Sequence, residues 1–154
     1  METPEEIAER ILASNLYMTL ATADGSGGPW ASPVWYAASP DRTELLWVSR
    51  PATRHSQNLA ERPELAIVIF DSTVPVYTGQ AVYNDAVAGI VPDEELERAM
   101  AVFAERSREE GEEWTVADVQ DPAELRLYRA VVRERWILDP DPDAGDRRVP
   151  VRLG

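Results

Sequence analysis

The chain has 154 residues, 44% of them hydrophobic, which suits one folded domain and is too apolar for a disordered chain. Its formal net charge of −13 disfavours nucleic acid and anionic membrane as partners. The absence of cysteine excludes disulfides and a cysteine nucleophile. No apolar run reaches the ~20 residues of a membrane-spanning helix. The acidic start of the chain lacks a signal-peptide pattern, so we expect a cytoplasmic protein.

The first part of the chain predicts a helix and then a β-hairpin. The helix covers Thr3–Ser14, with Thr3 as N-cap and Glu6 at the capping-box position. Leu16–Ala23 and Pro29–Ala38 have strand composition, and the Asp-Gly signal between them predicts a turn. Pro33 lies inside the second strand and predicts an edge position or a bulge.

The middle of the chain predicts three strands and a short helix. Thr43–Ser49 is the first of these strands, and Thr53 caps a helix that ends at about Glu61. Glu64–Phe70 is almost entirely apolar, which predicts a central strand buried on both faces. Val76–Asp85 has the composition of a further strand.

The last part predicts a long helix over about Asp93–Glu110, with Leu96, Met100 and Phe103 on one apolar stripe. A long strand that ends near Asp139 follows it. We expect one domain over residues 1–139 and an extended tail over 140–154, which is rich in Pro and Asp and has a strand-like end. Hairpin links dominate this order. The predicted fold class is therefore mainly β (α+β), with an antiparallel sheet, flanking helices and closure into a barrel that removes exposed edges.

Most familiar catalytic and metal-binding patterns are missing from the sequence. There is no phosphate-binding loop of the Walker type and no dinucleotide fingerprint. A single histidine, His55, does not make a histidine-rich metal site, so we predict no metal. Ser56 adjoins His55, but adjacent residues of a helix point in different directions, which disfavours a hydrolytic triad.

A basic pair at the start of the short helix is the strongest local signal. Thr53, Arg54 and His55 stand at a helix N-terminus, where free backbone N–H groups and the helix dipole favour an anion. The guanidinium of Arg54 also matches the geometry of a phosphate. The alternative is an ordinary surface helix in which Arg54 pairs with a nearby acid.

Aromatic residues on consecutive predicted strands form a second signal. They are Trp30, Trp35, Tyr36 and Trp47. Such residues either flank a flat ring system or pack in the core. For a bound ring system, we expect Trp35, Tyr36 and Tyr77 to line the site.

Together, these segments resemble a known family. The stretches YMTLATADGSGGPWASPVWYA, ELLWVSRPATRHSQNL, AIVIF and YTGQAVY, in this order, are similar to the pyridoxamine 5′-phosphate oxidase-like proteins, the FMN-binding split-barrel group. The resemblance implies a six-stranded antiparallel split β-barrel over residues 1–139. It also implies a homodimer with FMN in two symmetric clefts at the subunit interface.

The resemblance also assigns cofactor-binding residues. Along the flavin ring it places Ser32, Pro33, Val34 and Trp35. Near the ribityl and phosphate groups it places Val48 and Ser49. Around the phosphate it places Thr53, Arg54 and His55.

Two departures from the family pattern affect the predicted function. His55 stands where a lysine is common, and a neutral imidazole binds phosphate less firmly than an ammonium group. The arginines at Arg133–Trp136 lack the histidine that accompanies them in true oxidases, so pyridoxamine phosphate oxidation is not the leading prediction. We predict an FMN-dependent oxidoreductase acting on an unknown small molecule, with no catalytic residue identified. The alternatives are a non-catalytic flavin-binding or sensor protein, a deazaflavin-dependent barrel, and a haem protein with His55 as ligand.

Overall fold

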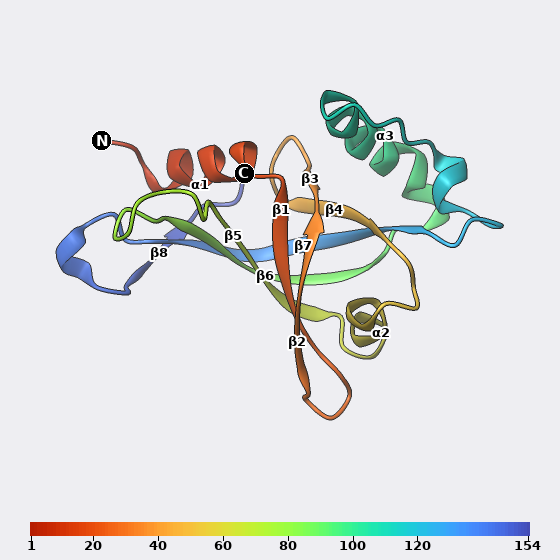
Figure 1. The fold of residues 1–154 in the computed structure, drawn as a ribbon, viewed down its shortest axis with the longest axis horizontal. Helices are drawn as coiled ribbons and strands as arrows, with labels where there is room; N and C mark the ends of the chain where they lie inside the picture. The colour runs from red at the N-terminus through yellow and green to blue at the C-terminus, as the bar shows by residue number, and fades with distance from the viewer.

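An antiparallel sheet curls around the core of the computed structural model, which describes residues 1–154 (Figure 1). The strands are β1 (Tyr17–Ala23), β2 (Pro29–Trp35), β3 (Ala37–Ala38), β4 (Glu44–Ser49), β5 (Glu64–Phe70), β6 (Ala81–Ile90), β7 (Arg126–Leu138) and β8 (Arg148–Val151). The helices are α1 (Pro4–Ser14), α2 (Arg54–Glu61) and α3 (Asp93–Glu109), with short 3-10 turns at Val116–Val119 and Pro142–Ala144. The strand order is β2-β1-β5-β6-β7-β4-β3, and β8 pairs with β7. The predicted α+β split barrel is confirmed.

The predicted number of strands, six, is wrong, because the sheet has eight. The segment predicted as one strand over Pro29–Ala38 forms two, β2 and β3, divided at Tyr36. The tail supplies the other additional strand, since Arg148–Val151 pairs with β7. None of the helices is long and apolar enough to cross a bilayer.

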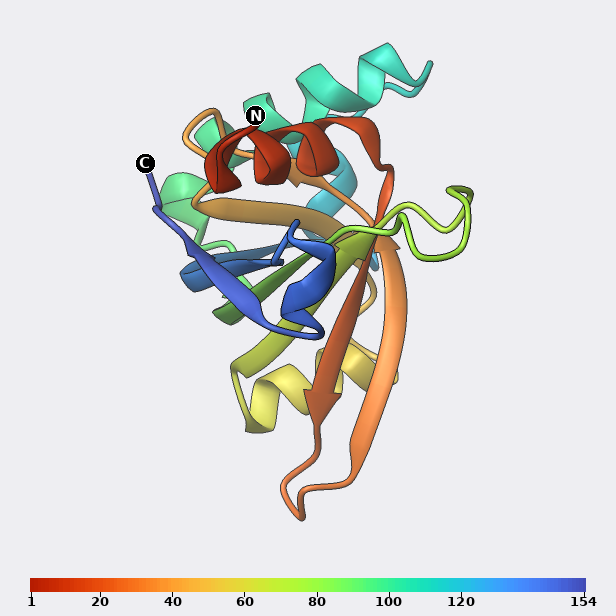
Figure 2. The same cartoon turned by 90° about the vertical axis from the view of Figure 1, so that its left-hand side faces the viewer.

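The first helix and hairpin form as the sequence predicts. Thr3 Oγ1 accepts a hydrogen bond from the Glu6 backbone N–H, and the Glu6 carboxylate accepts from the Thr3 N–H at 2.7 Å. Asp24 Oδ1 accepts from the backbone N–H groups of Ser26 and Gly28, which closes the turn between β1 and β2. Pro33 lies on β2, an edge strand, as predicted. Figure 2 shows that this hairpin extends beyond the rest of the sheet.

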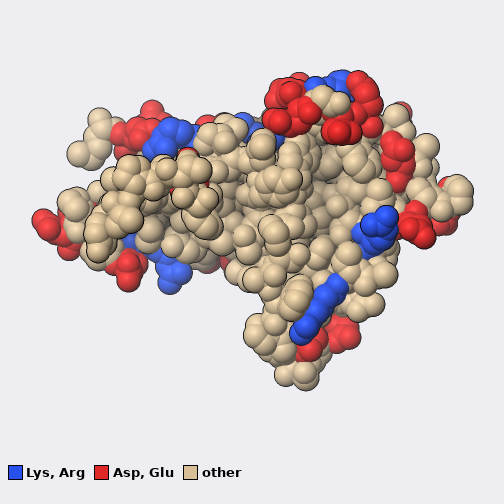
Figure 3. All heavy atoms as spheres, in the orientation of Figure 1, with Lys and Arg blue, Asp and Glu red and all other residues tan.

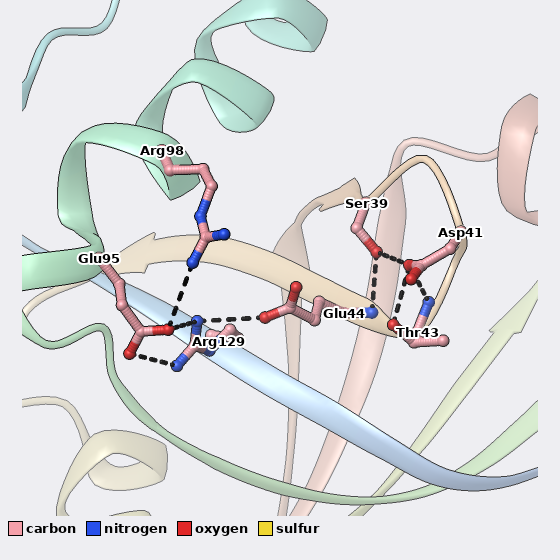
Figure 4. A network of polar contacts seen from close by, with 7 residues as sticks. All are labelled: Ser39, Asp41, Thr43, Glu44, Glu95, Arg98 and Arg129. Atoms are coloured by element: carbon pink, nitrogen blue, oxygen red, sulfur yellow. Dashed lines mark hydrogen bonds and ion pairs between the residues drawn. The ribbon is translucent and has the colours of Figure 1, made fainter.

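Helix α3 is held on the sheet at two levels. Its apolar stripe, predicted from the sequence, is buried: Leu96, Met100 and Phe103. Near its N-terminus, Arg129 of β7 donates to both carboxylate oxygens of Glu95, at 3.1 and 3.2 Å (Figure 4). The same guanidinium lies 3.1 Å from Glu44 of β4, and Arg129 lowers the pKa of Glu95. The position of α3 relative to β4 and β7 is therefore fixed.

Two local predictions on either side of the Asp71–Gln80 loop are wrong. Strand β5 is central but not buried on both faces, because Ala66 and Phe70 are exposed while their neighbours along the strand are buried. The strand predicted over Val76–Asp85 begins only at Ala81. Asp71 accepts hydrogen bonds from the N–H and hydroxyl of Thr73, which favours a turn in the preceding loop.

Two of the four aromatic residues on the predicted strands belong to the core. Trp47 and Tyr36 have no exposed surface, and Trp47 stacks on Tyr128 with ring centroids 5.5 Å apart. The Tyr36 hydroxyl donates a 2.7 Å hydrogen bond to the backbone carbonyl of Leu12 in the last turn of α1. Because helix C-termini leave carbonyls unpaired, this bond satisfies a buried acceptor.

Replacing Tyr36 with Phe removes this hydroxyl and leaves the shape of the ring unchanged. We expect the free energy of unfolding to fall by about 1–2 kcal/mol, because the buried Leu12 carbonyl loses its side-chain partner. Urea denaturation measures this change. The control is Tyr77→Phe, at a wholly exposed side chain, which should leave stability unchanged. A Tyr36→Phe variant as stable as the parent would contradict the assigned role.

Candidate functional site

A cavity of about 530 Å³ lies where β2, β4, α2 and α3 come together. Its walls are Tyr17, Pro33, Val34, Trp35, Val48, Ser49, His55, Phe103, Ser107, Glu110, Glu112, Trp114 and Leu125. Figure 1 shows α3 and α2 on opposite sides of β4, so the cavity is bounded by two helices that are far apart in the sequence. Its volume is in the range of small-molecule and cofactor sites.

Six of the nine predicted cofactor residues lie on the cavity wall. They are Pro33, Val34, Trp35, Val48, Ser49 and His55. Ser32 is the preceding residue of β2 and is not on the wall. Thr53 and Arg54 are also outside it, at the start of α2. The structure thus brings the β2 and β4 residues together with the beginning of α2.

One wall of the cavity is aromatic. The rings of Trp35 and Phe103 meet edge to face with centroids 5.2 Å apart, and Phe103 meets Trp114 in the same manner at 5.8 Å. Edge-to-face packing holds such rings in fixed orientations. Trp35 is therefore a lining residue as predicted, whereas Tyr36 lies in the core and Tyr77 is exposed in the Asp71–Gln80 loop.

The α2 end of the cavity carries hydroxyl groups and the imidazole. Ser49 Oγ and His55 Nε2 share a hydrogen bond of 2.9 Å, and Thr53 Oγ1 lies 3.3 Å from the same nitrogen. Thr53 is the predicted N-cap, because its hydroxyl accepts from the Ser56 N–H. His55 is buried, and this burial lowers its pKa. The imidazole is therefore neutral near pH 7, and it orders the hydroxyl groups of this end.

The alternative prediction was that Arg54 pairs with an acidic residue on an ordinary surface helix, but its nearest partner is an aromatic ring. Its guanidinium lies over the ring of Trp30, 4.3 Å from the ring centroid. It is in no ion pair, but its charge still acts on Asp24, whose pKa is lowered by hydrogen bonds from Ser26 and Gly28 and also by Arg54. The contact with Trp30 places a cation beside the N-terminus of α2.

Sequence reasoning missed the part of the cavity that α3 and the following segment provide. The missed residues are Tyr17, Phe103, Ser107, Glu110, Glu112, Trp114 and Leu125. Phe103 was identified only as part of an apolar helix stripe. No local pattern shows that a helix beginning 44 residues after the end of β4 packs back beside that strand, because the contact is purely tertiary.

The curled antiparallel sheet with a lateral cavity defines a split barrel. The family model described as pyridoxamine 5′-phosphate oxidase matches residues 3–138, and the chain belongs to this family. The resemblance found in the sequence is thereby confirmed. No match to the sequence is found among curated proteins.

Solved structures with this fold carry different cofactor descriptions. The chain is similar to a haem-binding protein from Mycobacterium smegmatis, with TM-score 0.74 and 21% identity over 98% of this chain, which spans only 58% of that protein. It is similar to HutZ, a haem storage protein from Vibrio cholerae, with TM-score 0.68 and 19% identity over 86% of this chain and 92% of that one. A third is an FAD-binding protein from Mesorhizobium loti, with TM-score 0.64 and 16% identity over 84% and 89%. At these identities the similarity shows the fold alone.

The burial of His55 predicts a specific dependence of stability on pH. The pKa of a histidine in an unfolded chain is about 6.5, and burial lowers it in the folded protein. The unfolded state therefore binds more protons below about pH 6.5, and the free energy of unfolding falls as the pH is lowered through this value. Most carboxylates titrate at lower pH, and the chain has only one histidine.

Urea denaturation between about pH 7.5 and pH 5.5 measures this slope. His55→Gln removes the titrating group and should flatten the profile in this window. A variant whose profile keeps the parental slope would show that His55 does not cause it.

Proposed function

We propose that the chain is an FMN-dependent oxidoreductase that acts on a small molecule over a flavin bound in this cavity. The observation that carries the proposal is the combination of an aromatic wall with a polar end at a helix N-terminus. When bound, FMN supplies the hydride or electron transfer. The protein's own residues would bind and orient the ring, exclude water and shape the substrate side.

The donors at the α2 end suit the phosphate of FMN. The first N–H groups of a helix have no intrahelical acceptor, and the dipole of α2 adds partial positive charge at this point. Arg54 supplies a full charge that is in no ion pair, and Thr53 and Ser49 supply hydroxyl groups. His55 would fix these hydroxyl groups in place rather than neutralise the phosphate, because its own pKa is lowered.

The flat end of FMN suits the rest of the cavity. Pro33, Val34 and Val48 provide apolar surface from two strands, and Trp35 contributes an aromatic ring. The deazaflavin alternative has less support, because a long anionic tail would meet Glu110 and Glu112 in a cavity without lysine or arginine. A non-catalytic flavin-binding or sensor protein would use the same donors.

Haem binding is the second candidate function. One support is the fold shared with a haem-binding protein and a haem storage protein. The other is His55, the single histidine of the chain, which lies on the cavity wall. Nε2 of His55 is already hydrogen-bonded to Ser49, so iron ligation through this nitrogen would require that bond to break. This competition favours FMN.

We also propose that two copies of the chain form a homodimer through the outer face of the sheet. Strand pairing aligns one continuous row of uncharged residues across six strands: Pro33, Thr19, Val68, Tyr83, Trp136 and Pro150. Each is exposed or half-buried in the single chain. Figure 3 shows a broad uncharged area in the middle of one face of the molecule. Because Pro33 also lines the cavity, a partner on this face would adjoin the cofactor site.

The visible spectrum of the purified protein tests the cofactor directly. Flavin absorbance, or its appearance after reconstitution with FMN, is the expected result. A Soret band would instead support haem. A colourless protein that does not take up FMN would contradict the proposed function. A second assay, turnover of a nicotinamide cofactor with an electron acceptor, distinguishes an enzyme from a non-catalytic sensor.

Replacing Arg54 with Ala should weaken FMN binding by about 1.5–3 kcal/mol, because a charge-assisted bond to the phosphate is lost. Fluorescence titration of FMN measures the dissociation constant. The matched control is Arg62→Ala, at the other end of α2, where the guanidinium donates to the Gly25 carbonyl. Equal losses in both variants would argue against a phosphate contact by Arg54.

The dimer is tested by a charge placed on the exposed face of β5. Light scattering should give twice the 17.2 kDa chain mass for the parent. Ala66→Glu, at an exposed position, should shift the protein toward the monomer, because it adds a negative charge beside its cross-strand partner Asp85 on the proposed interface. Ala101→Glu, on the exposed side of α3, should remain dimeric. A monomeric parent protein would refute the dimer.

A further inference from the structure

A second depression on the surface adjoins the cavity. The two share the lining residues Glu112, Trp114 and Leu125, and we call the two depressions together the groove. The second part is lined in addition by Arg50, Glu113, Ala117, Asp118, Ala123 and Glu124. A molecule that rests on the aromatic wall can therefore extend into a more polar and more exposed region.

The groove carries mainly negative charge. The cavity contains no lysine or arginine, and its one histidine is neutral because burial lowers its pKa. Glu110 and Glu112 line it as exposed carboxylates without an ion pair. In the second depression the only base is Arg50, which lies 3.4 Å from Glu124. Carboxylates that converge on a low-dielectric groove raise the local concentration of cations.

The arginine side chains of α3 do not line the groove. Arg106 donates to the Asn15 carbonyl at 2.6 Å and lies over the rings of Tyr36 and Trp35, 4.9 and 5.8 Å from their centroids. Arg108 is exposed and does not line either depression. Figure 3 shows acidic atoms gathered over the α3 region, with few basic atoms among them. The negative character of the groove is therefore local as well as a property of the whole chain.

We propose that the substrate side of this groove selects planar organic cations, such as positively charged nitrogen heterocycles, and rejects anionic or phosphorylated molecules. Trp114 offers a ring surface on which a flat cation can rest, and cations are attracted to such faces. Glu110 and Glu112 supply the complementary charge at the outer end. The selectivity rests on the proposed function, because the substrate would lie between Trp114 and the bound flavin.

The FMN phosphate is compatible with this arrangement, because its donors belong to other elements. Arg54 and Thr53 stand at the start of α2, whereas the carboxylates belong to the segment that follows α3. Figure 1 shows α2 and α3 on opposite sides of β4. The groove thus separates a site for an anion from a site for a cation.

Calorimetric titration of the FMN-loaded protein with two flat bicyclic probes tests the selectivity. One probe is the cation N-methylquinolinium, and the other is the anion naphthoate, which is similar in size. We expect the cation to bind about tenfold more tightly at low ionic strength, with a difference that shrinks when salt is added. The double variant Glu110→Gln with Glu112→Gln should remove most of this preference.

The matched control is Glu105→Gln with Glu109→Gln, which changes the net charge equally at two positions of α3 that do not line the groove. It should keep the parental preference. Equal affinities for the two probes, binding of neither probe, or an equal loss of preference in both double variants would overturn the proposal. The flavin absorbance of the same preparation is recorded separately. A protein without flavin that still prefers the cation would contradict the proposed function and leave the charge selectivity standing.

Discussion

The packing of α3 against the curled sheet is the constraint on which the rest of the structure depends. Leu96, Met100 and Phe103 bury one side of the helix, and the bidentate pair between Glu95 and Arg129 fixes its first turn. Burial of apolar surface supplies most of the attraction, whereas the partly exposed ion pair mainly fixes the orientation. With its start fixed, the helix carries Phe103 to the aromatic wall and leads the chain to Glu110.

The same packing makes the site a composite of distant segments. Strands β2 and β4 provide a rigid floor, α2 provides polar groups at its N-terminus, and α3 provides the far wall. Rigid elements hold side chains more precisely than loops do, which favours a site that orients a flat ring. His55 links the floor to α2, because its bond to Ser49 joins the end of β4 to the first turn of the helix.

The sequence predicted the elements with strong local signals and missed features that depend on tertiary contact. The caps at Thr3 and Thr53 were correct, since the side chain and its backbone partner lie within one turn. Strand β5 was predicted to be buried on both faces, but the single chain covers only one. Its outer face carries Ala66, Val68 and Phe70 beside Glu64, and it is the face through which we propose the dimer. Six of the nine predicted cofactor residues meet at the cavity. The family resemblance assigned them to β2, the end of β4 and the start of α2, which are not neighbours in the sheet order but come together in the curled fold. The part of the cavity wall formed by α3 and the segment after it was missed, because no local sequence pattern shows that Trp114 lies near Trp35.

The central claim is that the aromatic wall and the start of α2 hold the two ends of one FMN molecule. A crystal structure of the protein reconstituted with FMN tests it most directly. The ring system should lie against Trp35 and Val48, with the phosphate within hydrogen-bond distance of Arg54 and Thr53. An FMN molecule bound elsewhere, or a phosphate with no contact to the N-terminus of α2, would contradict this assignment.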